Sequence, residues 1–148
     1  GIEAVEQCLP DWDFEGSAYV RSRSEGVQIM LDESIHNHRD AVRACRGGCA
    51  DILNIKLMKC GGLFRASQIN SIAEAFGVGC MVGCMMETKL ATTAGVSLVA
   101  AKKNITEADC DSFLFYADEQ TGMTGGFTRE NDIFTLLDAP GFGLDLSF

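Results

Sequence analysis

The sequence predicts an α/β fold in which parallel strands alternate with helices. Short runs dominated by apolar residues, without clear polar alternation, are typical of strands buried on both faces of a parallel sheet. Stretches with helical signals separate these runs along the chain, which is the order of βαβ units. A charged residue stands at or near the end of each run, at intervals close to the roughly 30 residues of one βα unit in a barrel.

The positions of these runs define the expected elements. Asn37 precedes the second helical stretch and Gly77 follows the third, and both residue types are favoured at helix ends. Residues 121–148 are rich in glycine and turn residues, so we divide the chain into residues 1–120 and an extended exit segment, 121–148. Strands are expected over 2–7, 27–31, 51–57 and 77–85, with a weaker fifth over 109–115, and helices over 17–24, 38–46, 63–76 and 88–102.

The composition indicates one globular domain that binds a small ligand. The chain has 148 residues, of which 47% are apolar and 22% charged. Its net charge of -9 argues against nucleic acid or a membrane surface as a partner, because both attract basic patches. No apolar stretch approaches the roughly 20 residues of a membrane span, and no signal peptide pattern is present. A cytoplasmic location is therefore expected.

The seven cysteines predict reduced thiols in the core. Their number is odd, their surroundings are largely apolar, and no pair has C-x-x-C spacing, so a disulfide framework or a zinc site is disfavoured. The chain begins without methionine, and a strand-like run follows almost at once. We expect that a substantial N-terminal part is missing or that the chain is a processed piece.

Ionisable residues end the expected strands in a regular series. In a parallel sheet or barrel, the carboxyl ends of the strands form the face where active sites lie. The alternative is that strand ends are polar simply because the chain must return to water there. Glu6 ends the first strand, Asp32 the second and Lys56 the third, Glu87 follows the fourth, and Asp109 with Asp111 marks the fifth, at successive intervals of 26, 24, 31 and 22 residues.

The residue types in this series suit metal-assisted proton transfer. Glu6 and Asp32 offer hard oxygen ligands, which select Mg²⁺, or Mn²⁺, over zinc or copper. A nearby cation and partial burial would both disfavour the ammonium form of Lys56, so its pKa is expected to fall to about 7 to 8. Lys56 could then remove the proton from the α-carbon of a carboxylate substrate through an enediolate, while the metal stabilises the developing charge.

Five motifs resemble the later barrel strands of the enolase superfamily, muconate-lactonizing subgroup, in order and spacing: "VEQ", "LDES", "NIKLMKCGGL", "GCMMET" and "DCD". The resemblance implies the C-terminal half of a (β/α)8 TIM-type barrel, without its capping domain and earlier strands. It implies that Glu6 and Asp32 are metal ligands and that Lys56 is the acid/base, a pairing established in this superfamily. Lys59 would lie beyond the active-site position, in a loop or on the surface.

The D-x-D motif narrows the implied substrate. Asp109 and Asp111 resemble the pair with which dipeptide epimerases hold the substrate's free α-ammonium group, and alternate residues of a strand point the same way. Glu87 is a further candidate for lining the pocket. The implied activity is epimerisation of a dipeptide, of the L-Ala-D/L-Glu type, by 1,1-proton transfer. An absent lysine would serve the opposite face of the α-carbon.

One departure and several alternatives remain at this point. The family's E-Q-P reads Glu6-Gln7-Cys8, and proline returns only at Pro10. The isolated chain is expected to be inactive, and its open edges predict a homo-oligomer or association with a missing N-terminal half. The alternatives are a muconate cycloisomerase or o-succinylbenzoate synthase type of activity on the same scaffold, which would not need the aspartate pair, or a non-catalytic α/β module.

Overall fold

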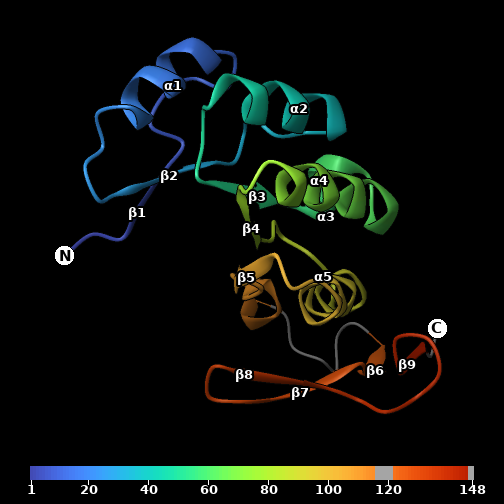
Figure 1. Ribbon diagram of the computed structural model, residues 1–148. Helices are drawn as coiled ribbons and strands as arrows, with labels where there is room; N and C mark the ends of the chain where they lie inside the picture. Colours follow the sequence, from blue (N-terminus) through green and yellow to red (C-terminus); the bar gives the residue numbers. More distant parts are fainter. Residues whose placement is uncertain (116–121, 147–148) are drawn as a thin grey trace.

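A computed structural model of the protein describes residues 1–115 and 122–146. Its centre is a parallel sheet of five strands whose spatial order equals their order in the chain (Figure 1). A doubly wound sheet reverses its strand order at a switch point, whereas a barrel wall does not. The arrangement is therefore that of a barrel wall. The strands are β1 (Ala4–Glu6), β2 (Gln28–Leu31), β3 (Ile52–Ile55), β4 (Gly79–Val82) and β5 (Ile105–Ala108).

The connecting helices lie along one side of this sheet (Figure 1). Side chains that face them form the core, and several of these, such as Leu53, Ile55 and Ile69, are completely or almost completely buried. Within residues 1–115 and 122–146, no helix is long and apolar enough to cross a membrane. The helices are α1 (Phe14–Arg21), α2 (His38–Gly47), the single turn α3 (Leu57–Cys60), α4 (Leu63–Ala75) and α5 (Lys89–Ala101).

The helix ends follow local chemistry. Asn37 caps α2 by accepting hydrogen bonds from the main-chain amides of Arg39 (2.8 Å) and Asp40 (3.3 Å), and Asp40 accepts from the Asn37 amide in return. Helix α4 is followed by Gly77 with φ +69°. Both boundary predictions are confirmed. The first helix begins three residues before the predicted start, because Asp13 accepts a hydrogen bond from the Gly16 amide (2.8 Å) and caps it.

The passage from β3 to α4 contains an element that the sequence did not predict. Strand β3 ends at Ile55, and Lys56 is the N-cap residue that precedes the single turn α3. Gly61 (φ +83°) and Gly62 (φ +103°) then redirect the chain into α4. The glycines suit this turn, since a left-handed backbone favours glycine.

The prediction of a fifth strand over 109–115 is wrong. The strand is Ile105–Ala108, and Ser112–Phe115 forms a 3-10 turn, η1. The apolar run was misleading, because β5 has one buried residue and three exposed ones and so lacks the apolar signal of the other strands. Asp109 nevertheless follows a strand end, since its amide continues the ladder to the Val82 carbonyl (2.8 Å).

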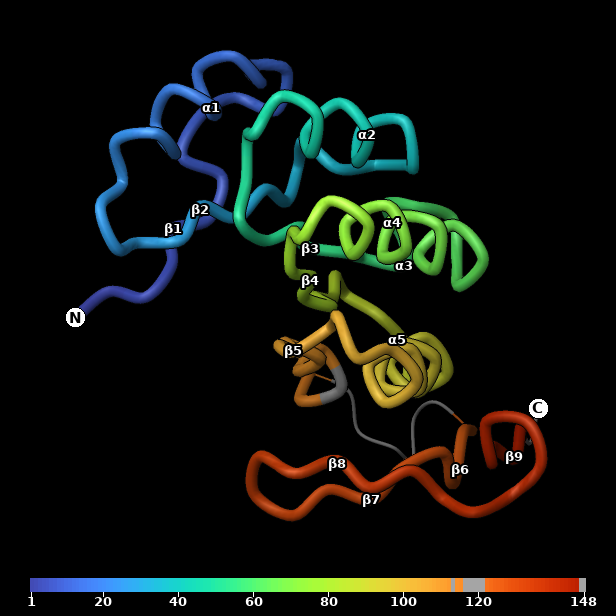
Figure 2. The backbone as a smooth tube through the Cα atoms, viewed as in Figure 1, coloured from blue at the N-terminus to red at the C-terminus, as the bar shows by residue number. Residues whose placement is uncertain are grey.

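The C-terminal segment forms two small antiparallel sheets beside α5 (Figures 1 and 2). One sheet pairs β6 (Met123–Gly125) with β9 (Leu144–Leu146), and the other pairs β7 (Phe127–Glu130) with β8 (Ile133–Leu136). The Lys89 ammonium of α5 lies 5.7 Å from the centre of the Phe127 ring. The boundary predicted between residues 120 and 121 falls in residues 116–121, outside the described part, so the division into two regions stays a prediction.

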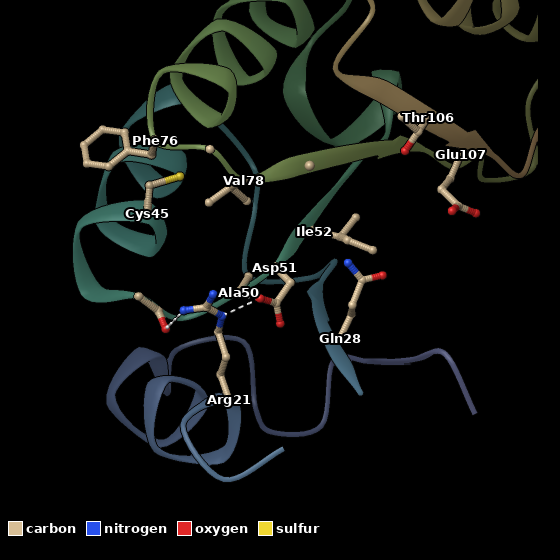
Figure 3. A pocket seen from close by; sticks show the side chains of 13 residues that line it. Arg21, Gln28, Cys45, Ala50, Asp51, Ile52, Phe76, Val78, Thr106 and Glu107 are labelled. Carbon is tan, nitrogen blue, oxygen red and sulfur yellow. Dashed lines mark hydrogen bonds and ion pairs between the residues drawn. The ribbon is translucent and has the colours of Figure 1, made fainter. Parts of the chain in front are cut away.

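A cavity lies at the amino-terminal ends of the strands (Figure 3). Its lining includes Gln28 and Gly79, which begin β2 and β4, and the ion pair between Arg21 and Asp51 (2.7 Å). The other carboxylate oxygen of Asp51 accepts a hydrogen bond from the Ile29 amide (2.9 Å). This pair joins α1 to two strands. In a βα barrel, residues at this end usually stabilise the fold, and the active site lies at the opposite end. The candidate functional site is therefore expected at the carboxyl ends of the strands.

Candidate active site

Lys56 and Asp32 form an ion pair at the carboxyl ends of their strands. Lys56 follows β3 and Asp32 follows β2, and the distance from Lys56 Nζ to Asp32 Oδ2 is 2.6 Å. The side chain of Lys56 is 20% exposed and that of Asp32 is 5% exposed. The lysine can therefore reach a ligand from a position that is largely shielded from water. The structure brings together these two predicted residues.

Lys59 belongs to the same cluster, so its prediction as a loop or surface residue is wrong. Its side chain is 10% exposed, and its ammonium group is ion-paired with Asp32. It also donates to the main-chain carbonyls of Asp32 and Asn54, the latter at 3.2 Å. The cause is α3: residues three apart share one face of a helical turn, so Lys59 turns back toward Lys56. The K-x-x-K spacing is the sequence signal that could have indicated this.

The paired charges determine the protonation states. Burial alone would raise the pKa of Asp32, but hydrogen bonds from Lys56 and Lys59 and their charges outweigh it and hold that pKa below its usual range. Burial is the largest influence on Lys59 and lowers its pKa. Burial would also lower the pKa of Lys56, but the hydrogen bond to Asp32 and the charges of Asp32, Glu6 and Glu33 raise it.

The raised pKa of Lys56 differs from the value near neutrality that the sequence predicts. That prediction assumed a cation beside the lysine, whereas the groups that face Lys56 in this structure are carboxylates. A negative neighbour favours the ammonium form, and a positive one disfavours it. The direction in which the pKa of Lys56 shifts therefore depends on whether Glu6 and Asp32 hold a cation.

Asn54 connects Glu6 to this cluster, and sequence reasoning missed it. Asn54 lies in β3, is 1% exposed, and donates from Nδ2 to Glu6 Oε1 at 2.7 Å. Gly83 follows β4 and leaves the space for this arrangement. A methyl group there would lie 2.6 Å from Asn54 Oδ1 and 3.0 Å from Lys56 Cε. The only sequence signal for Asn54 is a polar residue within an otherwise apolar strand.

The carboxylates of Glu6 and Asp32 fit a magnesium ion. Mg²⁺ in proteins is usually held by one or two carboxylates, with water and substrate oxygens in its other positions. Glu6 ends β1, and Asp32 follows the adjacent strand β2. The ammonium group of Lys56 already lies beside the Asp32 carboxylate. Among residues 1–115 and 122–146, no group of three or more His, Cys, Asp or Glu side chains could hold a metal ion. The two carboxylates would thus leave positions to other ligands.

Glu87 is a buried acid next to the Lys56 turn. Its residue is 3% exposed, and within the described part of the chain its Oε1 has no hydrogen-bond partner. Burial raises its pKa, although hydrogen bonds from the amides of Met85 and Met58 and the charge of Lys56 oppose this. A role for Glu87 in lining the substrate pocket stays a prediction.

Asp109 and Asp111 lie in the loop after β5 rather than on a strand, so the argument from strand alternation does not apply to them. Both line one cavity of about 300 Å³, whose opposite side comes from the β7–β8 hairpin, including Arg129 and Asp132. The Cys84 thiol, after β4, donates to Asp111 Oδ1 at 3.4 Å. The pair is therefore at the predicted end of the sheet, and its role in substrate binding stays a prediction.

Comparison with known proteins assigns the family. Residues 1–147 match the family described as Enolase C-terminal domain-like. The chain belongs to this family. The predicted resemblance to the enolase superfamily is confirmed, and so is the predicted fold class, because the similar structures are barrel enzymes of this superfamily and the five parallel strands form part of such a barrel.

Three similar proteins are named as epimerases. The L-Ala-D/L-Glu epimerase of Clostridium acetobutylicum is 39% identical over 144 residues, which are 97% of this chain and 39% of that protein. A substrate-liganded structure of the Bacillus subtilis L-Ala-D/L-Glu epimerase has a TM-score of 0.93 and 40% identity, covering 99% of this chain and 40% of that one.

The third is a structure of the dipeptide epimerase from Enterococcus faecalis, complexed with Mg and the dipeptide L-Leu-L-Tyr. It has a TM-score of 0.89 and 43% identity, and the match covers 97% of this chain and 40% of that one. The chain thus spans about two fifths of the length of the relatives it matches.

Proposed function

We propose that this chain forms the C-terminal part of a Mg²⁺-dependent dipeptide epimerase, an isomerase of the L-Ala-D/L-Glu type. The observation that carries this proposal is the cluster at the strand ends, where Lys56 lies 2.6 Å from Asp32 and Asn54 ties Glu6 to the same place. Relatives with names of this activity are 39% to 43% identical over almost the whole chain. The reaction would remove a proton from one face of an α-carbon and add a proton to the other face.

Lys56 is the group that transfers the proton on one face. As the neutral amine it accepts the proton of the α-carbon, and as the ammonium it returns one. When bound by Glu6 and Asp32, Mg²⁺ supplies positive charge that stabilises the substrate carboxylate as charge develops there and that offsets the carboxylates that raise the pKa of Lys56. The Lys56 side chain is 20% exposed, so it is partly shielded from water.

Lys59 and Asn54 hold the two carboxylates in place. The Lys59 ammonium is ion-paired with one oxygen of Asp32 while Lys56 contacts the other. Asn54 holds one oxygen of Glu6. Asp32 is buried and needs such partners, because an unpaired buried charge loses its hydration without compensation, whereas Glu6 is exposed. The carboxylates are thereby fixed before a ligand arrives.

Asp109 and Asp111 bind the free α-ammonium group of the dipeptide in this proposal. Both residues line one cavity after β5, and β5 ends at the same end of the parallel sheet as β3, the strand that Lys56 follows. Two negative charges compensate an ammonium group for the water it loses on binding. This assignment distinguishes a dipeptide substrate from the substrates of the alternative activities, which carry no such ammonium.

Epimerisation needs a second base on the opposite face of the α-carbon. We infer that an earlier barrel strand of a longer protein supplies it, together with a further metal ligand, so this chain alone would be inactive. In the five-stranded sheet, β1 and β5 each have a neighbour on one side only. Such edges pair readily with other strands. Association with an N-terminal half, or with another copy of the chain, would cover them.

We also infer a cytoplasmic location. All seven cysteines are free thiols, and Cys49, Cys60, Cys80 and Cys110 are buried. Reducing compartments preserve thiols in this state, whereas oxidising ones favour disulfides.

Substitution of the aspartate pair tests the substrate assignment. In a full-length protein that contains this chain, Asp109→Asn or Asp111→Asn should lower dipeptide turnover by at least about 100-fold, because the substrate's ammonium group would lose a charged partner. Asp132→Asn is the matched control, since Asp132 lines the same cavity from the hairpin. Unchanged turnover in both aspartate variants would contradict the assignment, as would an equal loss in the control.

A further inference from the structure

Gln7 connects the two strands that carry the candidate metal ligands. It directly follows Glu6, and its main-chain amide donates to the Met30 carbonyl of β2 at 2.9 Å. Its side-chain oxygen, Oε1, accepts hydrogen bonds from the main-chain amides of Asp32 (2.9 Å) and Ser34 (3.2 Å). The main chain of Gln7 is thus bonded to the strand before Asp32, and its side chain is bonded to Asp32 itself.

The amide nitrogen of the Gln7 side chain makes two further hydrogen bonds. Gln7 Nε2 donates to Ser34 Oγ at 2.9 Å and to the Leu9 carbonyl at 2.9 Å. Ser34 is 4% exposed, so its bond with Gln7 is partly shielded from water. The side chain uses its acceptor and both donor hydrogens, and a residue without both functions could not replace it.

The backbone of Gln7 adopts a conformation that costs energy. Its φ is +41°, in the left-handed region that non-glycine residues rarely occupy. Such a conformation persists when the surrounding structure over-determines it. Here the surrounding structure is the set of bonds to Asp32, Ser34, Leu9 and Met30. The turn after Glu6 is therefore held against its own preference.

We propose that Gln7 is a positioning residue that fixes the distance between Glu6 and Asp32 and so prepares these carboxylates for a divalent cation. Asn54 and Lys59 orient the carboxylate groups, whereas Gln7 holds the two main-chain segments that carry them. Partners of metal ligands contribute to affinity in this way, because they remove freedom that binding would otherwise have to remove. This inference rests on the proposed metal site of the enzyme.

Direct Mn²⁺ binding tests this role without measuring catalysis. Electron paramagnetic resonance on the full-length protein would report free Mn²⁺ during titration of the wild type, Gln7→Met and Gln7→Gly. Methionine keeps the length of the side chain and removes its hydrogen bonds. Glycine removes the side chain but accepts the positive φ without strain, so it retains the fold if methionine does not. Gln28→Met, at the start of β2 and far along the strand from Asp32, is the matched control.

The expected result is a loss of Mn²⁺ affinity of about 10- to 100-fold in both Gln7 variants and none in the control. Hydrogen exchange in the peptide spanning residues 31–35 should also accelerate, because the Asp32 and Ser34 amides lose their acceptor. Wild-type affinity in a folded Gln7 variant would overturn the positioning role alone. Failure of the wild type to bind Mn²⁺ would overturn the proposed metal site, and the positioning role with it.

Discussion

Asp32 is the residue on which the charges of the site converge. It accepts one ammonium group at each carboxylate oxygen, from Lys56 and from Lys59, and its pKa stays low despite burial. The carboxylate is therefore ionised over the whole physiological pH range. Lys59 gives Asp32 a positive partner in addition to Lys56, the proposed base.

Glu87 offers a prediction on stability and pH. Burial raises its pKa, so the folded state is penalised whenever this carboxyl is ionised. Below the ordinary pKa of a glutamate, the group is protonated in both the folded and unfolded states and the penalty is absent. As the pH rises through the pKa that Glu87 has in the folded state, its carboxyl group ionises and the free energy of unfolding falls. Glu87→Gln should therefore raise the free energy of unfolding at neutral pH by about 1 kcal/mol.

Urea denaturation at two pH values measures this effect. The gain from Glu87→Gln should shrink toward zero at acid pH, where the wild-type carboxyl is protonated. Glu107→Gln serves as the control, because Glu107 is an exposed glutamate on the neighbouring strand β5. A variant that is less stable than the wild type at neutral pH would show that Glu87 has an ionised, well-compensated carboxylate instead.

Among the elements, the single turn α3 explains why part of the site could be predicted from sequence and part could not. Strand-end positions are set by hydrophobic runs, so Glu6, Asp32 and Lys56 could be assigned to one end of the sheet. Lys59 depends on whether its segment is strand, loop or helix. Four residues are too few for a periodic signal, and the glycines after them indicate only where the turn ends.

The prediction of the fifth strand was wrong for a related reason. Tertiary pairing with β4 creates β5 from a segment with three exposed residues, whereas the more apolar residues after it form η1. Hydrogen bonds between strands that are far apart in the sequence produce no local sequence pattern, so they cannot be predicted from one. The same limit applies to Asn54, whose importance lies in a bond to Glu6, a residue 48 positions away.

The close approach of β4 to β3 predicts a strict requirement for glycine at position 83. In Gly83→Ala, the added methyl would lie 2.6 Å from Asn54 Oδ1 and 3.0 Å from Lys56 Cε, so both side chains must move. We expect a loss of stability of about 1 to 3 kcal/mol and a clear fall in kcat of the full-length protein. Chemical denaturation and turnover assays measure the two effects.

Gly79→Ala is the control for this substitution. Gly79 begins β4, the strand that Gly83 follows, and a methyl group there would make only ordinary contacts, with Asp51 O at 3.5 Å and Ile52 Cγ1 at 3.8 Å. Its effect on kcat should be small. If the two variants behave alike, the close packing at Gly83 does not govern the site.

At the scale of the whole molecule, the parallel sheet places every candidate residue at one end and a structural ion pair at the other. Arg21 and Asp51 connect α1 to the beginnings of β2 and β3 (Figure 3). Lys56 and Asp32 follow the other ends of β3 and β2. This division between a stabilising end and a reactive end is the general plan of βα barrels. The chain matches about two fifths of its relatives' length. Its candidate site contains one proposed base, Lys56, and two proposed metal ligands, Glu6 and Asp32.

Proton exchange tests the central claim that Lys56 is the base on one face of the α-carbon. The full-length protein and its Lys56→Met variant would be incubated with each dipeptide epimer in deuterated water, and deuterium at the α-carbon followed by NMR. Folding and Mn²⁺ binding of the variant would be verified first. The account predicts that conversion between epimers falls by about 10²- to 10⁴-fold and that at least one epimer no longer exchanges its α-proton. Conversion and exchange of both epimers at wild-type rates would contradict it.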